Sequence, residues 1–342
     1  MSNNLSGLRW CKAAGTAREI GLILGRQARD AVKRHLLGSE IWHKVNSPGL
    51  AASVARMSET TQRLYPEIWA ELEGLAEGLD LPLEQVMAWN CRGDLLESTA
   101  DGCTTVQLPG APAVIAHNED GLPFFKGSCF IAEIQPDNGC GFLSFCYPGS
   151  IPGHTFAMTD NGQVMTVNNL RLPDIEARIP RMVVCRAALT ARSQQEAIEI
   201  LGQHSSSGGF HVTLGQSGPQ PLMSVEFGAG QVSVREISLP AVHANHALHL
   251  ARALSDQIIT RSSADRQARG DWLLDNGIHD PLTILNDREG PGLPIRREAP
   301  DDPDHENTLA TALFRIGQNS IDWQIYEAVN DKPVWSGKKS TR

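Results

Sequence analysis

The hydrophobic pattern of this chain changes close to residue 103, and this change restricts the fold most. Before that point, apolar residues recur at helical spacing over 17–37 and 64–79, and Pro82 suits the first turn of a third helix. From residue 104 to 168, short apolar or β-branched runs alternate with PG, DG and NG turns. A helical portion followed by antiparallel strands predicts an α+β fold.

The rest of the chain continues with helices and strands. Ser193 followed by Glu196 forms a capping-box pattern at the start of one of these helices. We expect helices over 179–192, 193–204, 263–274 and 281–285, and strands over 210–215, 221–227, 231–237, 308–316 and 322–329. The SGKKS run at 336–340 is interpreted as a frayed basic tail. No internal repeat is found, and the length of 342 residues fits one large domain or two small ones.

Charge and composition exclude several classes of protein. The 342 residues carry 30 basic and 39 acidic side chains, a formal net charge of -9, which argues against a nucleic-acid partner. The first residues lack a signal-peptide pattern, and no run of about 18 apolar residues predicts a membrane span. We therefore expect a cytoplasmic protein, and whether it forms a homo-oligomer stays open.

Neither the cysteines nor the histidines form a metal-binding pattern. The seven cysteines are scattered without a CxxC pair, so reduced thiols are expected. His243, His246 and His249 are three residues apart, a spacing that spreads them around a helix and turns the first two to opposite sides of a strand. GxSxG, HExxH and GxxxxGK[ST] are absent. We expect no metal and no cofactor.

A thiol follows a glycine at the change of pattern, in the tetrapeptide Gly102-Cys103-Thr104-Thr105. If Cys103 attacks the carbonyl of Gly102, the amide becomes a thioester, and water then releases a chain that begins with Cys103. The new α-amine has a reference pKa of about 7.7–8.0, so it can take the proton of the thiol near neutral pH. Taken alone, such a cysteine is more often a small buried hydrophobic residue.

Further segments resemble the isopenicillin N acyltransferase family of cysteine N-terminal-nucleophile (Ntn) hydrolases. They are REIGLILGRQARDAV, the stretch with Asn90 and Arg92, DGCTT, IAHNED, GHTFAMTDNGQVMTVNNL, IPRMVVCRAAL, HANH and SSADRQAR. The resemblance implies a four-layered αββα sandwich. It also implies self-cleavage between Gly102 and Cys103, giving a helical fragment 1–102 and a catalytic fragment 103–342 that associate as one domain.

The same resemblance implies roles for individual residues. Cys103 would be the nucleophile and, through its α-amine, the general base. The side-chain amide of Asn245 and the backbone N–H of Asp120 would stabilise the oxyanion, and the Asp120 carboxylate would orient the amine. Arg266 would lie near the sulfur, and Asn168 would contact the substrate or the amine. Without the resemblance, Asp120 would be a turn residue, Arg266 a solvated helix residue and Asn168 a local hydrogen-bonding residue.

The expected reaction is hydrolysis of a small linear amide through a thioester on Cys103. Acyl transfer to an amine, with acyl-CoA as an open choice of donor, is the main alternative, and an uncleaved binding protein is a second. Phe210 and His211 stand where the family pattern has an asparagine before a strand. We therefore expect the substrate to differ from that of the acyltransferase itself.

Overall fold

The computed structural model describes residues 7–96, 102–173, 175–203, 207–327 and 332–341. Its helical elements are α1 Ala17–Ala31, η1 Val32–Leu36, α2 Glu40–Val45, η2 Pro48–Leu50, α3 Ala51–Leu64, α4 Pro66–Leu79, α5 Leu83–Asn90, α6 Arg92–Leu95, η3 Pro123–Phe125, α7 Arg181–Ala188, α8 Gln194–Gln203, α9 Ala251–Ser255, α10 Arg261–Asp275 and α11 Pro281–Leu285. Its strands are β1 Arg9–Gly15, β2 Gly102–Leu108, β3 Ala113–Gly121, β4 Phe130–Pro136, β5 Phe142–Cys146, β6 Phe156–Thr159, β7 Gln163–Leu170, β8 Gly209–Gln216, β9 Met223–Gly228, β10 Gln231–Glu236, β11 Ala241–His243, β12 Asn307–Ile316, β13 Ser320–Tyr326 and β14 Trp335–Ser340.

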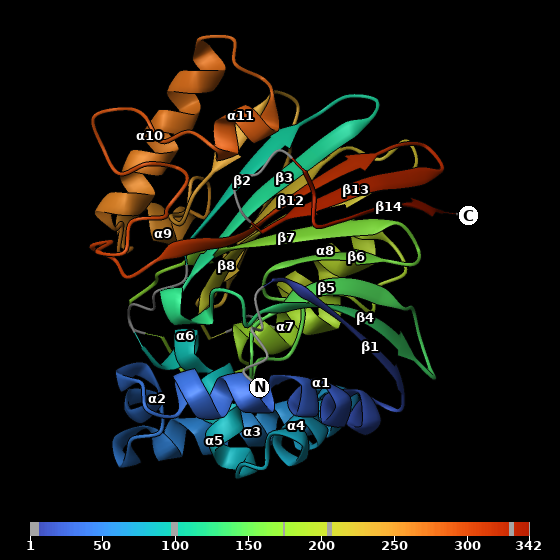
Figure 1. The fold of residues 1–342 in the computed structure, drawn as a ribbon, viewed down its shortest axis with the longest axis vertical. Coiled ribbons are helices and arrows are strands. Elements are labelled where there is room, and N and C mark those ends of the chain that lie inside the picture. Colours follow the sequence, from blue (N-terminus) through green and yellow to red (C-terminus); the bar gives the residue numbers. More distant parts are fainter. Residues whose placement is uncertain (1–6, 97–101, 174, 204–206, 328–331, 342) are drawn as a thin grey trace, which may run out of the picture.

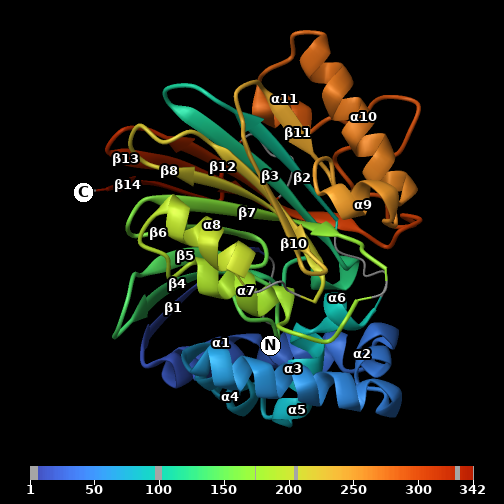
Figure 2. The ribbon, with the colours of Figure 1, turned by 180° about the vertical axis from the view of Figure 1, so that it is seen from behind.

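These elements form four layers, as Figure 1 shows. The N-terminal helices with α7 and α8 cover the outer face of an eight-stranded sheet, in the order β1-β4-β5-β6-β7-β8-β9-β10. A six-stranded sheet, in the order β11-β2-β3-β12-β13-β14, packs on its inner face, and α10 and α11 cover the other side. The same layers are seen from behind in Figure 2. The predicted αββα sandwich is confirmed.

Each sheet draws strands from several parts of the sequence. The strands expected between 104 and 168 are all present, but β2 and β3 belong to the six-stranded sheet and β4 to β7 to the other. Strand β1 was not predicted within the helical first hundred residues. It pairs in parallel with β4, while the other strand pairs in both sheets are antiparallel.

The interpretation of residues 336–340 as a frayed tail is wrong. They lie in β14, which pairs with β13 along its length. Lys338 and Lys339 form ion pairs with Asp322 at 3.3 Å and Asp160 at 2.6 Å, so the basic side chains hold the strand in place. Charged side chains are common on exposed edge strands, where they discourage pairing with another chain.

Helices α1 and α4 pack closely because both carry glycines at their contact. A Cβ on Gly21 would lie 1.9 Å from the carbonyl oxygen of Glu71, and one on Gly78 would lie 2.4 Å from that of Leu22. Side chains at these positions would force the helices apart. The same helical layer includes α6, which carries the pocket residues Arg92 and Gly93 described below.

The described helices include none with the length and apolar character that crossing a bilayer requires.

Candidate active site

Cys103 lies near the start of β2, and its strand pairing decides which residues surround it. In the antiparallel pair with β3, Cys103 is opposite Glu119 and Thr105 is opposite His117. Because side chains alternate along a strand, these four point to one face, towards the eight-stranded sheet, where Thr105 contacts Asn168 of β7. The side chain of Cys103 is buried, with 3% of the residue exposed.

The main chain of Cys103 is held from the opposite face by Asn245 and Arg266. The Cys103 N–H donates to Oδ1 of Asn245 at 2.8 Å. Arg266, on α10, donates through Nη1 to the carbonyl oxygen of Cys103 and, at 2.9 Å, to the hydroxyl of Thr104. Arg266 is fully buried and binds the peptide group of Cys103. Burial lowers the pKa of Arg266, and the charges of Asp120, Glu306 and Cys103 act in the opposite direction. The predicted effect of Arg266 on the sulfur stays a prediction.

The orientation of the Asn245 amide follows from its neighbours. Nη2 of Arg266 is only a donor, and it lies 2.7 Å from Oδ1, so the oxygen must face the arginine. Nδ2 then donates to the carbonyl oxygen of Asn169 at 3.2 Å. Asn169 lines the pocket beside Cys103, so the amide N–H of Asn245 points to the main chain of a pocket residue.

Asp120 lies opposite Gly102 in the β2–β3 pair and is fully buried. Its Oδ1 accepts a hydrogen bond from the Thr308 hydroxyl at 2.6 Å, whereas Oδ2 is buried without a hydrogen-bond partner among the described residues. Burial raises the pKa of Asp120, and the charge of Arg266 acts in the opposite direction. A buried carboxylate oxygen without a donor suits a group that gains an ammonium neighbour.

Asn168 is buried, and it is bound within the sandwich. Its Oδ1 accepts from Thr105 at 2.7 Å, and its Nδ2 donates to the carbonyl oxygen of His243 at 3.0 Å. It does not line the pocket, whereas its neighbour Asn169 does. Its predicted contact with the substrate stays a prediction.

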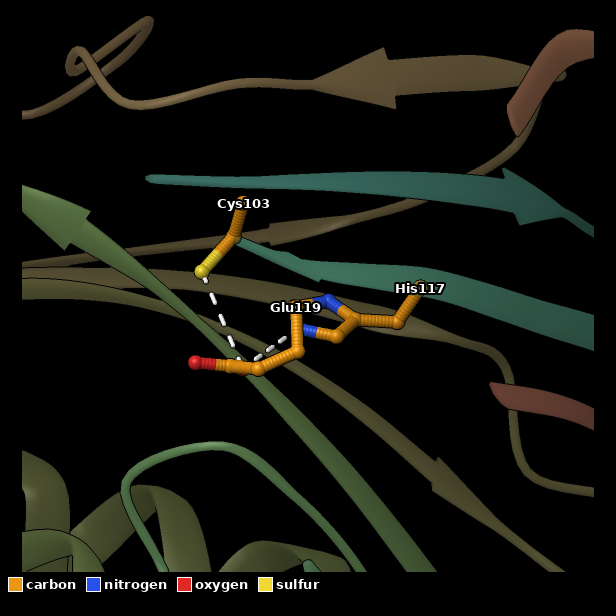
Figure 3. Close-up of side chains that lie close together, drawn as sticks. All are labelled: Cys103, His117 and Glu119. Carbon is orange, nitrogen blue, oxygen red and sulfur yellow. Dashed lines mark hydrogen bonds and ion pairs between the residues drawn. The ribbon is translucent and has the colours of Figure 1, made fainter. Parts of the chain in front are cut away.

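Glu119 and His117 stand beside the sulfur of Cys103 (Figure 3). Oε2 of Glu119 lies 3.8 Å from Sγ and 3.1 Å from Nε2 of His117. The other carboxylate oxygen accepts from the hydroxyl of Tyr147 at 2.8 Å. Burial lowers the pKa of His117 to about 3, so the imidazole is neutral at ordinary pH.

Gly102 is required for space. It is not among the glycines with positive φ. A Cβ at this position would lie 2.3 Å from Oε2 of Glu306. Glu306 is itself held by Arg171 at 3.1 Å and Arg297 at 3.3 Å, so it has little freedom to move away. The residue before Cys103 therefore has no room for a side chain.

A narrow pocket opens beside Cys103 between the two sheets and α6–α7. Its lining residues are Arg92, Gly93, Cys103, Glu119, His154, Val167, Asn169, Arg181, Met182 and Phe210. The free volume is about 10 Å³, roughly the space of one water molecule. The guanidinium of Arg181 lies over the ring of Phe210, 4.2 Å from its centroid, and donates to Oδ1 of Asn169 at 2.6 Å. Two arginines and a glutamate thus line the pocket.

The three histidines near Asn245 are bound to protein groups, and His243 and His249 share Glu226, which lies 3.6 Å from Nδ1 of His249. His243 lies 2.9 Å from Glu226, His246 lies 2.8 Å from Ser263, and His249 lies 2.9 Å from Ser224. Among the described residues, the group of three potential metal ligands that converge within 4.8 Å is Cys103, His117 and Glu119. A thiolate, an imidazole and a carboxylate are common zinc ligands.

Comparison with known proteins places the chain in a family. Residues 108–328 match the acyl-coenzyme A:6-aminopenicillanic acid acyl-transferase family, which is more than half of the chain. The chain belongs to this family. It is also 22% identical, over 351 aligned positions that cover 90% of each protein, to the beta-alanyl-dopamine/carcinine hydrolase of Drosophila melanogaster. The protein is therefore an enzyme, an amide hydrolase or an acyltransferase, and the resemblance seen in the sequence is confirmed.

Within this acyl-transferase family fold, the predicted site residues do not all meet at one point. Cys103, Asn245 and Arg266 are in direct contact, and Asp120 lies on the adjoining strand. Asn168 is hydrogen-bonded to Thr105 and to the main chain of His243. The predicted cleavage site, Gly102–Cys103, lies at the start of β2, and residues 97–101 before it lie outside the described residues.

Glu119 and His117 were not predicted as site residues, although the sequence carries a signal for them. In the strand AVIAHNED, period-two alternation puts His117 and Glu119 on one face and Asn118 and Asp120 on the other. Once β3 is paired with β2, the first face must adjoin Cys103. The family pattern drew attention to Asp120 alone, on the opposite face.

Proposed function

We propose that this enzyme is a self-processing cysteine amidohydrolase of the Ntn type, with Cys103 as its nucleophile. The main observation in support of the proposal is the position of two atoms of Cys103, its main-chain nitrogen and its sulfur. Its main-chain nitrogen is held by Oδ1 of Asn245 at 2.8 Å, and its sulfur is at the wall of the pocket. An N-terminal cysteine uses these two atoms as base and nucleophile.

In the proposed reaction, chain cleavage between Gly102 and Cys103 first frees the α-amine. This amine takes the proton of the thiol, and the thiolate attacks the carbonyl carbon of the substrate amide. The Nδ2 group of Asn245 and the backbone N–H of Asp120 donate to the oxyanion. The leaving amine departs with a proton, and water then hydrolyses the thioester. The unpartnered oxygen of Asp120 supports its role in orienting the amine.

Arg266 supports the proposal through the peptide group of Cys103. It binds the carbonyl oxygen of Cys103 and Oδ1 of Asn245 together, so it fixes the nucleophile relative to the amide donor. Such preorganised donors account for much of the rate of acyl-transfer enzymes. We propose that fragments 1–102 and 103–342 remain one domain after cleavage, since β1 lies in the same sheet as β4 to β10.

The substrate that we propose is a small linear amide. The Drosophila relative is named for hydrolysis of beta-alanyl-dopamine and carcinine, so beta-alanyl-dopamine is the first compound to test. The pocket holds Arg92 and Arg181 as well as Glu119, which gives a polar substrate partners of both signs. The scattered cysteines, without a CxxC pair, support the cytoplasm as the compartment.

Acyl transfer is the second candidate, because the family is named for an acyl-CoA-dependent transferase. Both reactions share the thioester on Cys103 and differ in whether water or an amine attacks it. Purified enzyme should be given beta-alanyl-dopamine alone, and then acyl-CoA with an amine acceptor. Release of free amine supports hydrolysis, and a new amide with release of CoA supports transfer.

Denaturing mass spectrometry tests the processing step. We expect fragments of 102 and 240 residues, which together make the 342 of the chain. An intact chain with full activity would refute the N-terminal nucleophile. An intact chain without activity on any amide or acyl-CoA would support the remaining alternative, a binding protein.

A further inference from the structure

A chain of hydrogen bonds inside the sandwich fixes where the protons lie near Cys103. Nδ2 of Asn168 donates to the carbonyl oxygen of His243, which can only accept, so Oδ1 of Asn168 faces the other way. The hydroxyl of Thr105 lies 2.7 Å from this Oδ1 and must donate to it. The one hydroxyl proton of Thr105 is therefore committed to Asn168.

The next link fixes the tautomer of His117. Nδ1 of His117 lies 2.9 Å from the oxygen of Thr105, whose own proton is used, so Nδ1 must carry the proton and donate. The fully buried imidazole is neutral and holds one proton. Its other nitrogen, Nε2, therefore has a lone pair.

This lone pair points at Glu119. Nε2 of His117 is 3.1 Å from Oε2 of Glu119, and when the carboxylate is ionised these two atoms are both acceptors. A hydrogen bond at this distance needs a proton between them. The thiol of Cys103, 3.8 Å from the same Oε2, is a source of that proton (Figure 3).

We infer that the Glu119–His117 pair is the base that takes the proton of the Cys103 thiol when the precursor cleaves itself. This inference rests on the self-cleavage proposed above. The α-amine cannot serve at this stage, because the nitrogen of Cys103 is still part of a peptide bond and donates its hydrogen to Asn245. The precursor therefore needs a base that the mature enzyme does not.

The step balances in atoms and charge. The thiol proton moves to Oε2 of Glu119, where it forms an O–H···N bond to His117, and the thiolate attacks the carbonyl carbon of Gly102. The C–N bond then breaks, and the nitrogen of Cys103 receives the proton back from Glu119 as it becomes an amine. Water hydrolyses the Gly102 thioester, which regenerates the thiol and leaves a carboxyl group on Gly102.

Other charged or titratable groups also face this position. The Tyr147 hydroxyl binds Oε1 of Glu119, and Arg92, Arg181 and His154 line the pocket beside it. The charge of Glu119 also raises the pKa of Cys129, after burial as the main cause. The Tyr147 hydroxyl donates to the carboxylate that would accept the proton.

The test is the substitution Glu119→Gln. The glutamine amide can donate to the lone pair of His117 and still accept from Tyr147, so the fold should keep its thermal stability. Self-cleavage should slow by roughly 10²–10⁴, the usual contribution of general-base catalysis. The control is Glu133→Gln, the same substitution on β4, at a half-exposed side chain away from Cys103. Precursors made by cell-free translation are followed by intact mass.

The pH dependence separates a base from a structural residue. Ionised carboxylates are available well below neutral pH, so the wild-type cleavage rate should be level between about pH 6.5 and 8. In Glu119→Gln the thiol must lose its proton to solvent, and the rate should rise about tenfold per pH unit. This profile in the wild type is informative even if the variant does not fold.

The outcomes are distinct. If the wild type never cleaves, the proposed function fails. If the wild type cleaves and Glu119→Gln cleaves within threefold of it at every pH, only the base assignment is overturned. A wild-type rate that rises tenfold per pH unit also overturns it. So does cleavage that EDTA stops and zinc restores, because a metal would then occupy the position of the proton.

Discussion

The main-chain nitrogen of Cys103 lies 2.8 Å from Oδ1 of Asn245, although the two residues are 142 positions apart. Nδ2 of the same side chain donates to the main chain of Asn169, a residue of the pocket, and we propose that it also donates to the substrate. Two variants of Asn245 can separate the acceptor role of Oδ1 from the donor role of Nδ2.

Asn245→Ala should lower kcat by roughly 10²–10³ with little change in KM, because an oxyanion donor acts mainly in the transition state. Asn245→Asp keeps an oxygen for Cys103 and Arg266 but loses the donor. Its kcat should fall as far as that of the alanine variant, while its melting temperature stays nearer to that of the wild type. An aspartate variant with wild-type kcat would contradict the donor role. Steady-state kinetics and thermal melts of both variants decide this.

Cys103→Ala should give an intact chain without turnover, since it has no nucleophile for either reaction. Cys103→Ser should cleave more slowly than the wild type, because a hydroxyl is a weaker nucleophile than a thiol. Intact-mass measurement and an amidase assay follow the two steps. Amidase activity in the alanine variant would show that another residue is the nucleophile.

Gly102→Ala should destabilise the fold by about 1–3 kcal/mol, the usual cost of an added methyl group in a filled space, and should slow self-cleavage. The reason is the contact with the Glu306 carboxylate. Gly38→Ala is a matched control, because a Cβ there would meet nothing within 4 Å. Chemical denaturation measures the stabilities. Equal stability in the two variants would contradict the steric explanation.

EDTA should leave the amidase activity of the processed enzyme unchanged. His243, His246 and His249 are bonded to Glu226, Ser263 and Ser224, and the proposed mechanism uses no metal. Enzyme dialysed against EDTA is compared with enzyme dialysed against buffer. A loss of activity that zinc restores would overturn the roles given to Asn245 and to the α-amine.

Asp94 should make stability depend on pH. Burial raises its pKa to about 6, so the folded state binds its proton more tightly than the unfolded state does. Stability from this group is therefore greatest at low pH and is lost as pH rises from about 3.8 to about 6. Asp94→Asn can still accept from the N–H groups of Arg181 and Gly208 but cannot titrate. The melting temperature of the wild type minus that of the variant should fall over this interval and level off above it. A constant difference would contradict the raised pKa.

The layers of the fold could be predicted because the hydrophobic period changes near residue 103 and because the motifs occur in the family order. Strand β1 could not, since its pairing partner β4 is more than a hundred residues away and its own alternation is short. Strand β14 was missed for the same reason. Its lysines resemble those of a solvated tail in the sequence, and only the structure shows their ion pairs with Asp322 and Asp160.

At the site, the sequence identified the residues that contact the main chain of Cys103 and missed those beside its sulfur. Asn245 and Arg266 belong to recognisable motifs. His117 and Glu119 can be placed beside Cys103 only when the register of β3 against β2 is known. The need for glycine at position 102 comes from the small space that Glu306 leaves, which the sequence alone does not show. Register and side-chain contact are tertiary properties, which periodicity alone does not specify.

Strand β1 has a consequence for how the mature protein would denature. Trp10 packs against Trp323 and Trp335 of the other sheet, and the Trp335 indole N–H donates to the carbonyl oxygen of Leu8 at 2.9 Å. After cleavage behind Gly102, the N-terminal fragment would therefore still pair with one sheet and pack against the other. If heating separated the two fragments, however, they could reassociate only through a bimolecular encounter. Refolding would become second order in protein concentration, and dilute enzyme would lose activity at a rate set by its unfolding barrier.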